Sequence, residues 1–568
     1  MKVFVHQLKK LEAMKKYLIV LSVVFILNPL YAQIVFEPLN NDIYSYLDRL
    51  SQKGVIELND IIKPLSRTYI SQKLEEAGSK INMLTDLEKE ELDFFAKEYF
   101  IELEYFKKED ENNPSSGLRS SLSNRYRLFS YDDNTFKFGA GPSVGYEISF
   151  PGSSRNVHSW VGMYGYGYFL KNIGLSFNFK TNNEHGNSID VKKDFTPETG
   201  ILSVSHDHGK DIDYSEVNSM VSYDWKWGDI SVAKDYIEYG YAKSGKIVFS
   251  NKAPSFPFVR LHLKPIKWIH FYYYHAWLSS DIIDSLMLSE NRRDIYINKF
   301  LAWHAISFTP FEGFDLSIGE SVVYSDKIEP LYLMPFMVFY MADQFISNRH
   351  DQPGDANSQV FLSVSSRNFL KNTHIYGTFF IDELTLKGIN GTLFVDSKTI
   401  ENSLDDNKLR PQVACTIGAS VTDLPVDNLT VTAEYTRINP FVYGHHDPAQ
   451  TYTTSSYLMG HWMGHNADLI YLNFNYRFIR GLQTNVWGEF IRKGSSDYSG
   501  QYEMPQPKFL FGLMNRYQYY GINLKYEFIH DLNFEMSYKL SKVSNEVTTG
   551  IFENKHINEF SLVAYYGL

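Results

Sequence analysis

Groups of histidine and acidic residues are the clearest candidates for chemistry in this chain. They are His206-Asp207-His208, His445-His446-Asp447 and the pair His461 and His465. Imidazole and carboxylate groups are suitable ligands for zinc and similar ions. These residues all lie in long polar stretches, where the sequence indicates no fixed ligand geometry. In a chain with 17 histidines we interpret them as solvated loop residues, and we predict no metal and no cofactor.

The common signatures of enzymes are missing from the sequence. It contains no phosphate-binding glycine loop, no Gly-x-Ser-x-Gly elbow and no His-Glu-x-x-His pair. Gly139-Ala140-Gly141 lacks the third glycine of a dinucleotide fingerprint and lies in a strand pattern. The net charge of −11 disfavours nucleic acid, because phosphate binding needs clustered cations. We therefore predict neither an enzyme nor a nucleic-acid-binding protein.

Aromatic residues in the polar stretches suggest a different chemistry. Tyr452, Tyr457, Trp462, Tyr498 and Tyr502 stand beside Asn, Asp and Gln residues. Aromatic rings together with amides and carboxylates can bind sugars, since such sites combine apolar faces with a few placed polar groups. The alternative is that these aromatic residues form a girdle at a membrane interface. The sequence leaves both interpretations open.

The pattern that must position these residues changes along the chain. After residue 117 the apolar residues recur at every second position, as in Leu429-Val431-Ala433-Tyr435 and Ile470-Leu472-Phe474-Tyr476-Phe478. Such alternation indicates strands with one apolar face. Short turns, such as the one at Arg480-Gly481, alternate with long polar loops. This alternation is typical of a bacterial membrane barrel, whose turns are short on one side and long on the other.

Composition supports the same class of protein. Aromatic residues make up 16% of the 568 residues, although hydrophobic residues make up only 44%. Transmembrane barrels combine these features, because only alternate residues face lipid and aromatic girdles mark both interfaces. A single-chain barrel needs an even number of strands, and counting from about Phe136 gives roughly eighteen, with about sixteen as the alternative. One segment, Leu331–Ala342, is apolar on every side, and we expect it either to enter the lumen or to lie under the loops.

Residues 41–107 have helical periodicity instead. Asp42–Lys53 forms one amphipathic pattern, Ser66 can cap a second, and Thr85-x-x-Glu88 is a capping box before a third. The polar run 107–117 then reads as a linker. The predicted fold is thus mainly β: a transmembrane antiparallel β-barrel of about eighteen strands preceded by a small three-helix periplasmic bundle.

The first residues have the layout of a signal peptide. Lys9, Lys10, Lys15 and Lys16 precede the apolar run Tyr17–Leu27, and Tyr31-Ala32-Gln33 follows after a break at Asn28-Pro29. That run is too short for a transmembrane helix, which needs about 20 apolar residues. We therefore predict a signal peptide at 1–32, a periplasmic helical bundle at 33–116 and an outer-membrane β-barrel at 117–568. Cys415 is the only cysteine, which excludes a disulfide within the chain and a lipidated cysteine after the cut.

Four stretches together resemble a known family. They are Leu50–Leu74, Ala253–Leu278, Phe314–Pro335 and Gln359–Glu383. Their combination is similar to the capsule-assembly Wzi family, in its Bacteroidetes-type version. The resemblance implies an outer-membrane barrel of about eighteen strands with periplasmic helices, which binds capsular or surface polysaccharide and helps attach it without catalysing its synthesis. The expected partners are therefore capsular or exopolysaccharide and outer-membrane lipid, and we expect a monomer in the cell outer membrane.

Several polar residues stand in otherwise apolar strand patterns within those stretches. They are Arg260, His275, Glu320, Glu329, Arg367, Asp382 and Glu383. A charge on the lipid face costs about 2–4 kcal/mol at mid-membrane, so we expect these residues in the lumen or at its rim. With Trp462 they are the candidate lumen-lining or polysaccharide-binding residues. The alternative role is a lattice of ion pairs that braces the barrel.

Two other functions remain open at this point. A solute-diffusing, porin-like channel would need an open lumen. A surface adhesin or motility component would use the same loops on a different partner. No catalytic residue is predicted for any of these functions.

Overall fold

The computed structural model describes residues 34–107, 128–133, 135–170, 172–207, 209–284, 294–347, 356–382, 411–503 and 506–567. The predicted signal peptide and Glu383 lie outside these residues. The described part of the chain contains no helix that is long and apolar enough to cross a membrane.

Eighteen antiparallel strands in the described residues form a closed barrel, which confirms the predicted fold class. They are β3 (Phe136–Pro151), β4 (Asn156–Phe169), β5 (Ile173–Gly186), β7 (Asp211–Trp225), β8 (Gly228–Asp235), β10 (Phe256–Ile266), β11 (Ile269–Ile283), β12 (Tyr296–Phe311), β13 (Phe314–Ser325), β14 (Asn357–Arg367), β15 (Thr373–Asp382), β16 (Val413–Thr422), β17 (Leu429–Ile438), β20 (Ala467–Ile479), β21 (Leu482–Lys493), β22 (Asn515–Ile529), β23 (Leu532–Thr548) and β24 (Ile551–Tyr566).

The barrel closes between its first and last strands. β24 pairs with β3 from Glu559 opposite Pro151 to Tyr566 opposite Val144. The short strand β2 (Phe129–Asp132) pairs with the beginning of β3 and lies outside this ring of eighteen. The barrel therefore begins at Phe136, where parity had placed its first strand.

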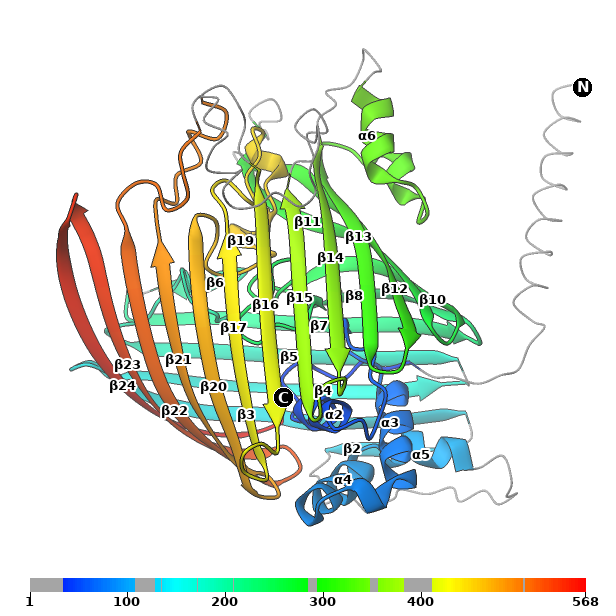
Figure 1. Cartoon of the computed structure of the whole chain (residues 1–568). Helices are drawn as coiled ribbons and strands as arrows, with labels where there is room; N and C mark the ends of the chain where they lie inside the picture. The colour runs from blue at the N-terminus through cyan, green and yellow to red at the C-terminus, as the bar shows by residue number, and fades with distance from the viewer. Residues whose placement is uncertain are drawn as a thin grey trace, which may run out of the picture.

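Short turns gather at one end of the barrel and long loops at the other (Figure 1). Only Arg480 and Gly481 separate β20 from β21, whereas residues 439–466 separate β17 from β20. We call these the turn end and the loop end. Side chains alternate between the two faces of the wall: on β20, Leu472 and Phe474 are exposed on the outer face, and their neighbours Tyr471 and Asn473 face the lumen.

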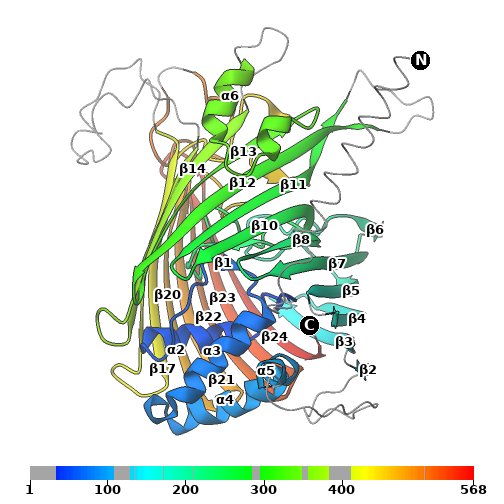
Figure 2. The ribbon, with the colours of Figure 1, turned by 90° about the vertical axis from the view of Figure 1, so that its right-hand side faces the viewer.

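Four helices lie at the turn end (Figures 1 and 2). They are α2 (Ile43–Gln52), α3 (Arg67–Ser79), α4 (Asp86–Glu98) and α5 (Phe100–Lys107). Ser66 caps α3, and Thr85 with Glu88 forms the predicted capping box of α4. The predicted third helix is divided in two, because the chain leaves helical geometry at Tyr99, whose side chain is buried in the helical core. The bundle thus has four α-helices in the described residues and not three.

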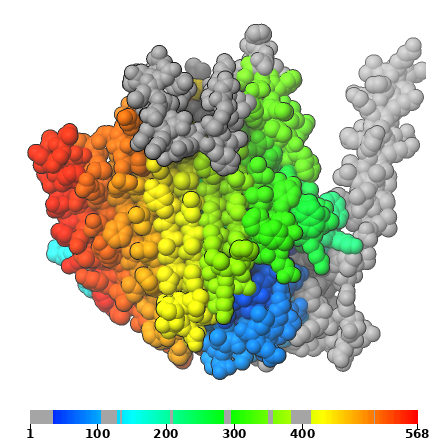
Figure 3. All heavy atoms as spheres, in the orientation of Figure 1, coloured from blue at the N-terminus to red at the C-terminus, as the bar shows by residue number. Residues whose placement is uncertain are grey.

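Buried ion pairs attach the helical segment to the barrel. Arg367, at the end of β14, donates to Asp60 at 2.6 Å and to the carbonyl oxygen of Leu58 at 3.0 Å. Arg477 on β20 pairs with Glu91 at 2.8 Å. All four side chains are buried, so each attachment holds charges away from water, where neighbouring opposite charges compensate them. The space-filling view shows this segment, in blue, seated against the lower part of the wall (Figure 3).

The N-terminal residues also enter the lumen. β1 (Ile62–Lys63) pairs with β9 (Glu238–Tyr239), which belongs to the loop between β8 and β10. The Ser222 hydroxyl on the barrel wall donates to the carbonyl oxygen of Ile34. The chain before the barrel is therefore joined by hydrogen bonds both to the wall and to a loop that folds inward from the loop end.

We predict that Arg367→Ala loosens the helical segment. The substitution leaves Asp60 buried with only Lys63, 3.1 Å away, as a cation. Breaking a buried pair costs about 3 kcal/mol or more, which corresponds to roughly a hundredfold higher population of the detached state. Limited proteolysis of the detergent-solubilised protein measures this population. Lys97→Ala, at an exposed pair with Asp93, is the control and should change the cleavage rate less than about fivefold. Equal rates in the two variants would contradict the prediction.

The same contact predicts a dependence on acid. Burial alone would raise the pKa of Asp60, but Arg367 and Lys63 hold that pKa at about 2. A carboxyl whose folded pKa is depressed stabilises the attached state above its unfolded pKa of about 3.9 and stops doing so as the pH falls through its folded pKa. Hydrogen exchange of α2 and α3 should therefore stay slow down to about pH 4 and rise between about pH 4 and 2. In Arg367→Ala the rise should begin at a higher pH; an unchanged profile would contradict the assignment.

Candidate functional site

A cluster of buried aromatic residues crosses the middle of the lumen. Tyr239 lies at its centre, with its ring centroid 5.4 Å from that of Trp303 and 4.9 Å from that of Phe361. Phe249 and Tyr452 pack beside them and come from two different loops of the loop end. All five side chains are buried. The inward loops therefore fill the width that a barrel of this size would otherwise leave to water.

Two of the cavities in the described part of the chain lie beside this cluster. The larger has a volume of about 410 Å³ and lies against strands β20–β23; we call it the amide cavity. Its wall residues are Tyr471, Asn473, Asn485, Trp487, Glu489, Tyr519, Asn523 and Lys539, and inward loops supply Phe195, Thr196, Pro197, Lys243, Ser244 and Trp462. Neighbouring strands thus bring rings and hydrogen-bonding groups to one surface.

Trp487 forms a flat aromatic surface in the amide cavity. It lies directly opposite Gly521 on the next strand, and a Cβ atom at Gly521 would come within 2.2 Å of the indole ring. Only glycine allows this close approach, which lays the ring along the wall. The other face of the ring is then available to the cavity, where Trp487 is partly exposed.

Amide groups form a hydrogen-bonded row beside this ring. Asn475 donates to Asn485 at 3.0 Å and to Gln483 at 3.1 Å, and Asn473 lies 3.4 Å from Asn485. The side-chain amide oxygen of Asn473, Oδ1, is buried and accepts no hydrogen bond within the described chain. A buried acceptor of this kind favours a partner that brings its own donor, such as a hydroxyl group.

One cation and one carboxylate complete the amide cavity. Lys539 lies over the ring of Tyr519 at 4.9 Å, a cation–π contact. Glu489 is the only carboxylate among the lining residues. Glycoside hydrolysis usually needs two carboxyl groups on either side of the scissile bond. The lining is therefore suited to holding a polar, ring-containing ligand and lacks the pair that this chemistry requires.

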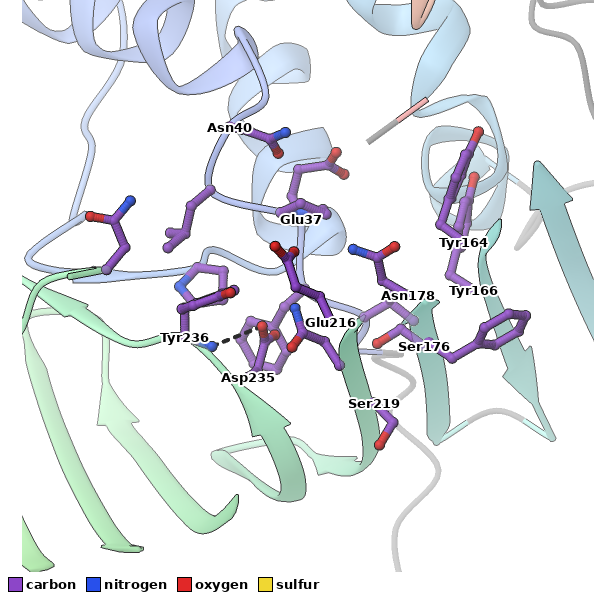
Figure 4. Close-up of a pocket in the computed structure, with 18 of the residues that line it drawn as sticks. Glu37, Asn40, Tyr164, Tyr166, Ser176, Asn178, Glu216, Ser219, Asp235 and Tyr236 are labelled. Carbon is purple, nitrogen blue, oxygen red and sulfur yellow. Dashed lines mark hydrogen bonds between the residues drawn. The ribbon is translucent and has the colours of Figure 1, made fainter. Parts of the chain in front are cut away.

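The smaller cavity has a volume of about 310 Å³ and lies beside the N-terminal residues 35–40. We call it the N-terminal cavity (Figure 4). Tyr164 and Tyr166 line it from β4, and Asn178 and Glu216 line it from β5 and β7. Asp235 accepts a hydrogen bond from the backbone N–H of Tyr236 at 2.8 Å at its edge. Rings, amides and carboxylates are again combined.

Arg67 connects this cavity to the helical segment. It contacts Glu37 at 2.6 Å, Glu102 at 2.7 Å and Glu98 at 3.0 Å, and it lies 4.3 Å from the ring of Tyr166. Although burial alone would lower the pKa of Arg67, these acids raise it well above its usual value. The guanidinium therefore stays charged, and its position fixes that edge of the cavity.

The loop between β5 and β7 lies between the two cavities. Phe195–Pro197 line the amide cavity, and Thr199 lines the N-terminal cavity. Lys252 donates to the carbonyl oxygens of Lys193 and Glu198 and so ties this loop to the inward loop after β8. Both cavities thus depend on loops that enter from the loop end.

Four of the predicted site residues point into the lumen. Arg260 pairs with Asp229 at 2.6 Å, and Arg367 pairs with Asp60. Asp382 accepts hydrogen bonds from the backbone N–H of Tyr443 and from Gln359. Trp462 donates to the carbonyl oxygen of Ser244 at 2.8 Å, and it alone of the four lines the amide cavity.

The expectation that His275 and Glu320 face the lumen or its rim is wrong. They lie on the outer face, because Trp303 and Leu301 of the adjoining strand face the central cluster and alternate residues face the other way. His275 contacts the Tyr324 hydroxyl at 2.8 Å, and Glu320 contacts His304 at 3.0 Å. Glu329 lies just after β13, where it accepts a hydrogen bond from the N–H of Leu331. A segment described below covers this part of the wall.

Two histidines of the loop between β17 and β20, His461 and His465, have structural roles. His461 accepts a hydrogen bond from the N–H of Met463, and His465 accepts one from the N–H of Phe441. Burial lowers the pKa of each imidazole to about 3, so both are neutral. Both side chains are buried, so the prediction that they are solvated loop residues is wrong. Within the described ranges, no three His, Cys, Asp or Glu residues are grouped to hold a metal ion.

The wall of the amide cavity was missed by sequence reasoning. On β20, Tyr471, Asn473 and Asn475 alternate with exposed apolar residues, and that alternation was used only to identify a strand. Two asparagines in succession on a lumen face were the available signal. Their convergence with Trp487 could not be seen without the register between the strands.

Comparisons with known proteins identify the fold. No protein-family model and no curated protein matches the chain. Among solved structures it is similar to Wzi of Escherichia coli, described as a carbohydrate-binding β-barrel of the outer membrane involved in group 1 capsule assembly, with a TM-score of 0.53, 11% identity and coverage of 94% of this chain and 99% of Wzi. This chain has the fold of an outer-membrane β-barrel.

Two channel proteins are also similar. OprD of Pseudomonas aeruginosa matches with a TM-score of 0.41 and 11% identity over 76% of this chain and 95% of its own. OccAB2 of Acinetobacter baumannii matches with a TM-score of 0.42 and 8% identity over 75% of this chain and 97% of its own.

We predict that the protein does not conduct ions steadily. The central cluster crosses the lumen, and moving an ion through packed aromatic side chains would remove its hydration without compensation. Purified protein in a planar bilayer should therefore give no uniform conductance steps at high salt. A general porin reconstituted in parallel shows that the assay detects an open lumen. Uniform steps from the purified protein would show that a water path bypasses the cluster.

Proposed function

We propose that this chain is an outer-membrane protein that binds surface polysaccharide and helps retain it on the cell. The observation that carries the proposal is the amide cavity, where the flat Trp487 ring adjoins a row of asparagine side chains. Sugars offer apolar ring faces and many hydroxyl groups, and this lining matches both. The fold shared with Wzi, which is described as carbohydrate-binding, supports the same assignment.

The orientation in the membrane follows from the two ends of the barrel. Bacterial barrels have short periplasmic turns and longer extracellular loops. The turn end, with the helical segment, then lies in the periplasm, and the loop end faces outward. A signal peptide at 1–32, a helical region at 33–116 and a barrel at 117–568 agree with this arrangement. The polymer would reach the lumen from the side where Trp462 and the inward loops lie.

The proposed role is binding and not turnover. The amide cavity offers a single carboxylate, Glu489, where hydrolysis would need a pair. The central cluster disfavours passage of a polymer through the lumen. We therefore infer that a short part of the polysaccharide enters from the loop end, is held in the amide cavity, and is neither cut nor transported.

Trp487→Ala tests the site in the purified protein. Oligosaccharides released from the surface polysaccharide of the producing bacterium serve as ligands in calorimetric titrations. Loss of a central aromatic contact typically costs about 1–2 kcal/mol or more, so the affinity should fall at least about fivefold. Trp160→Ala is a matched control: Trp160 lies against Gly145 as Trp487 does against Gly521, yet it is absent from the linings of both cavities.

The same pair of variants tests the role in the cell. In a deletion strain, polysaccharide should move from the cell-bound to the released fraction while the total stays the same. Complementation with Trp160→Ala should restore retention, and Trp487→Ala should restore less than half of it. If the deletion leaves cell-bound polysaccharide unchanged, the proposed function is wrong. If both variants restore retention fully, the site has been placed in the wrong cavity.

A further inference from the structure

A segment on the outer face of the barrel remains unexplained by polysaccharide binding. After β13 the chain forms the short helix η2 (Pro330–Leu333) and the helix α6 (Phe339–Ser347), which lie beside the upper part of the wall (Figures 1 and 2). One side of this segment is buried against β11, β12 and β13: Tyr332, Phe339, Ala342 and Ile346 pack onto Tyr273, Phe300, Val322 and Tyr324. We call residues 328–347 the outer segment.

The free side of the outer segment is apolar and uncovered within the described chain. Phe336 is 70% exposed and Met341 is 66% exposed. Leu333, Met334 and Val338 are exposed by about half. A helix with large apolar side chains on both sides is not stable against water, since a surface helix usually turns a polar face outward. The free side therefore needs an apolar neighbour.

Polar groups of the segment are satisfied by the wall. Glu320 accepts hydrogen bonds from the backbone N–H groups of Phe339 at 2.7 Å and Tyr340 at 3.4 Å, at the start of α6. His304 lies 3.0 Å from the same carboxylate and contacts the carbonyl oxygen of Pro335 at 3.0 Å. These contacts replace water at the helix start. Such replacement is required where water is absent, as in hydrocarbon.

The outer segment is continuous with the apolar outer face of the strands. Ile318 on β13 and Leu362 on β14 face the same side as Glu320 and are exposed. The Phe336 ring stacks on Phe271 at 4.6 Å, and Phe271 is near the turn end of β11. The segment therefore starts at the loop end and reaches well along the wall, among residues whose exposed neighbours are apolar.

We propose that residues 328–347 lie in the hydrocarbon core of the membrane, with their free side in contact with lipid acyl chains. This position accounts for the apolar run Leu331–Ala342. It also accounts for Glu320 and His304 on the outer face, because they bind the polar backbone groups at and just before the start of α6, where water has no access. The ligand in this proposal is a hydrocarbon chain. A protein partner or a second copy on the same surface is the alternative that the test must separate.

Fluorescence quenching tests the position of the outer segment. In a Cys415→Ser background, cysteines are introduced singly as Phe336→Cys or Met341→Cys and labelled with an environment-sensitive fluorophore. The full chain is reconstituted in phosphatidylcholine vesicles that contain doxyl-labelled lipid, and aqueous iodide is the opposing quencher. Ile417→Cys, 63% exposed on the outer face of β16, is the lipid-facing control. Ser496→Cys, exposed in the loop after β21, is the aqueous control.

We expect both probes to be quenched by doxyl lipid as strongly as the Ile417 probe and by iodide at least about fivefold less than the Ser496 probe. Iodide quenching equal to that at Ser496 would overturn the proposal. Protection from both quenchers would also overturn it, because another protein surface would then cover the segment. This inference rests on the proposed membrane location, and the Ile417 control distinguishes failure of that location from failure of the inference. If lipid does not quench the Ile417 probe itself, the membrane location is wrong.

A substitution on the wall gives a second measurement. Glu320→Ala removes the acceptor at the start of α6 without touching the exposed side chains. In the Phe336→Cys background it should raise iodide quenching several-fold, because the freed N–H groups would draw the segment toward water. Glu320→Gln keeps an acceptor oxygen and should remain close to the parent. Identical quenching in Glu320→Ala and the parent would show that the wall does not hold the segment.

Discussion

The pairing of β24 with β3 is the interaction on which the rest of the structure depends. It turns eighteen strands into a ring without free edges, and a ring of that size leaves a wide lumen. The chain fills that width from both ends, with residues 34–66 from the turn end and loops from the loop end. Tyr239 shows the result, since β9 pairs with the N-terminal strand β1 and its tyrosine packs at the centre of the cluster.

Charges in this barrel are placed according to access to water. On the lumen side, Arg367 pairs with Asp60 and fixes the helical segment to the wall, whereas Arg260 pairs with Asp229 of a neighbouring wall strand. On the outer face, Glu320 and His304 serve the outer segment. Both arrangements follow one rule: a charged group removed from water persists where a partner compensates it. The amide cavity differs from these ion pairs, because the Asn473 side-chain oxygen and one face of the Trp487 ring can still contact an external ligand.

Much of the fold could be predicted from single residues and their spacing. The alternation of apolar residues predicted the strands, and the Thr85–Glu88 capping box predicted the start of α4. A count of strand segments, restricted to an even number, predicted how many strands the barrel has. The division of the third helix at Tyr99 was missed, because its cause is packing in the helical core. Among the candidate site residues, Arg260, Arg367, Asp382 and Trp462 lie in the lumen, and their part in binding stays a prediction. His275 and Glu320 lie on the outer face instead. The prediction used the free-energy cost of a charge that faces lipid, and it did not foresee that the outer segment covers these two residues.

The sequence by itself determined the class of the protein, because a period of two with aromatic residues and alternating turn lengths is a local property that each strand carries. Only the tertiary structure decided what fills the lumen and what covers the outer face. The amide cavity needs Trp487 opposite Gly521, and the outer segment needs Glu320 beneath α6. Both are contacts between residues far apart or on different strands, and their register exists only once the barrel has closed.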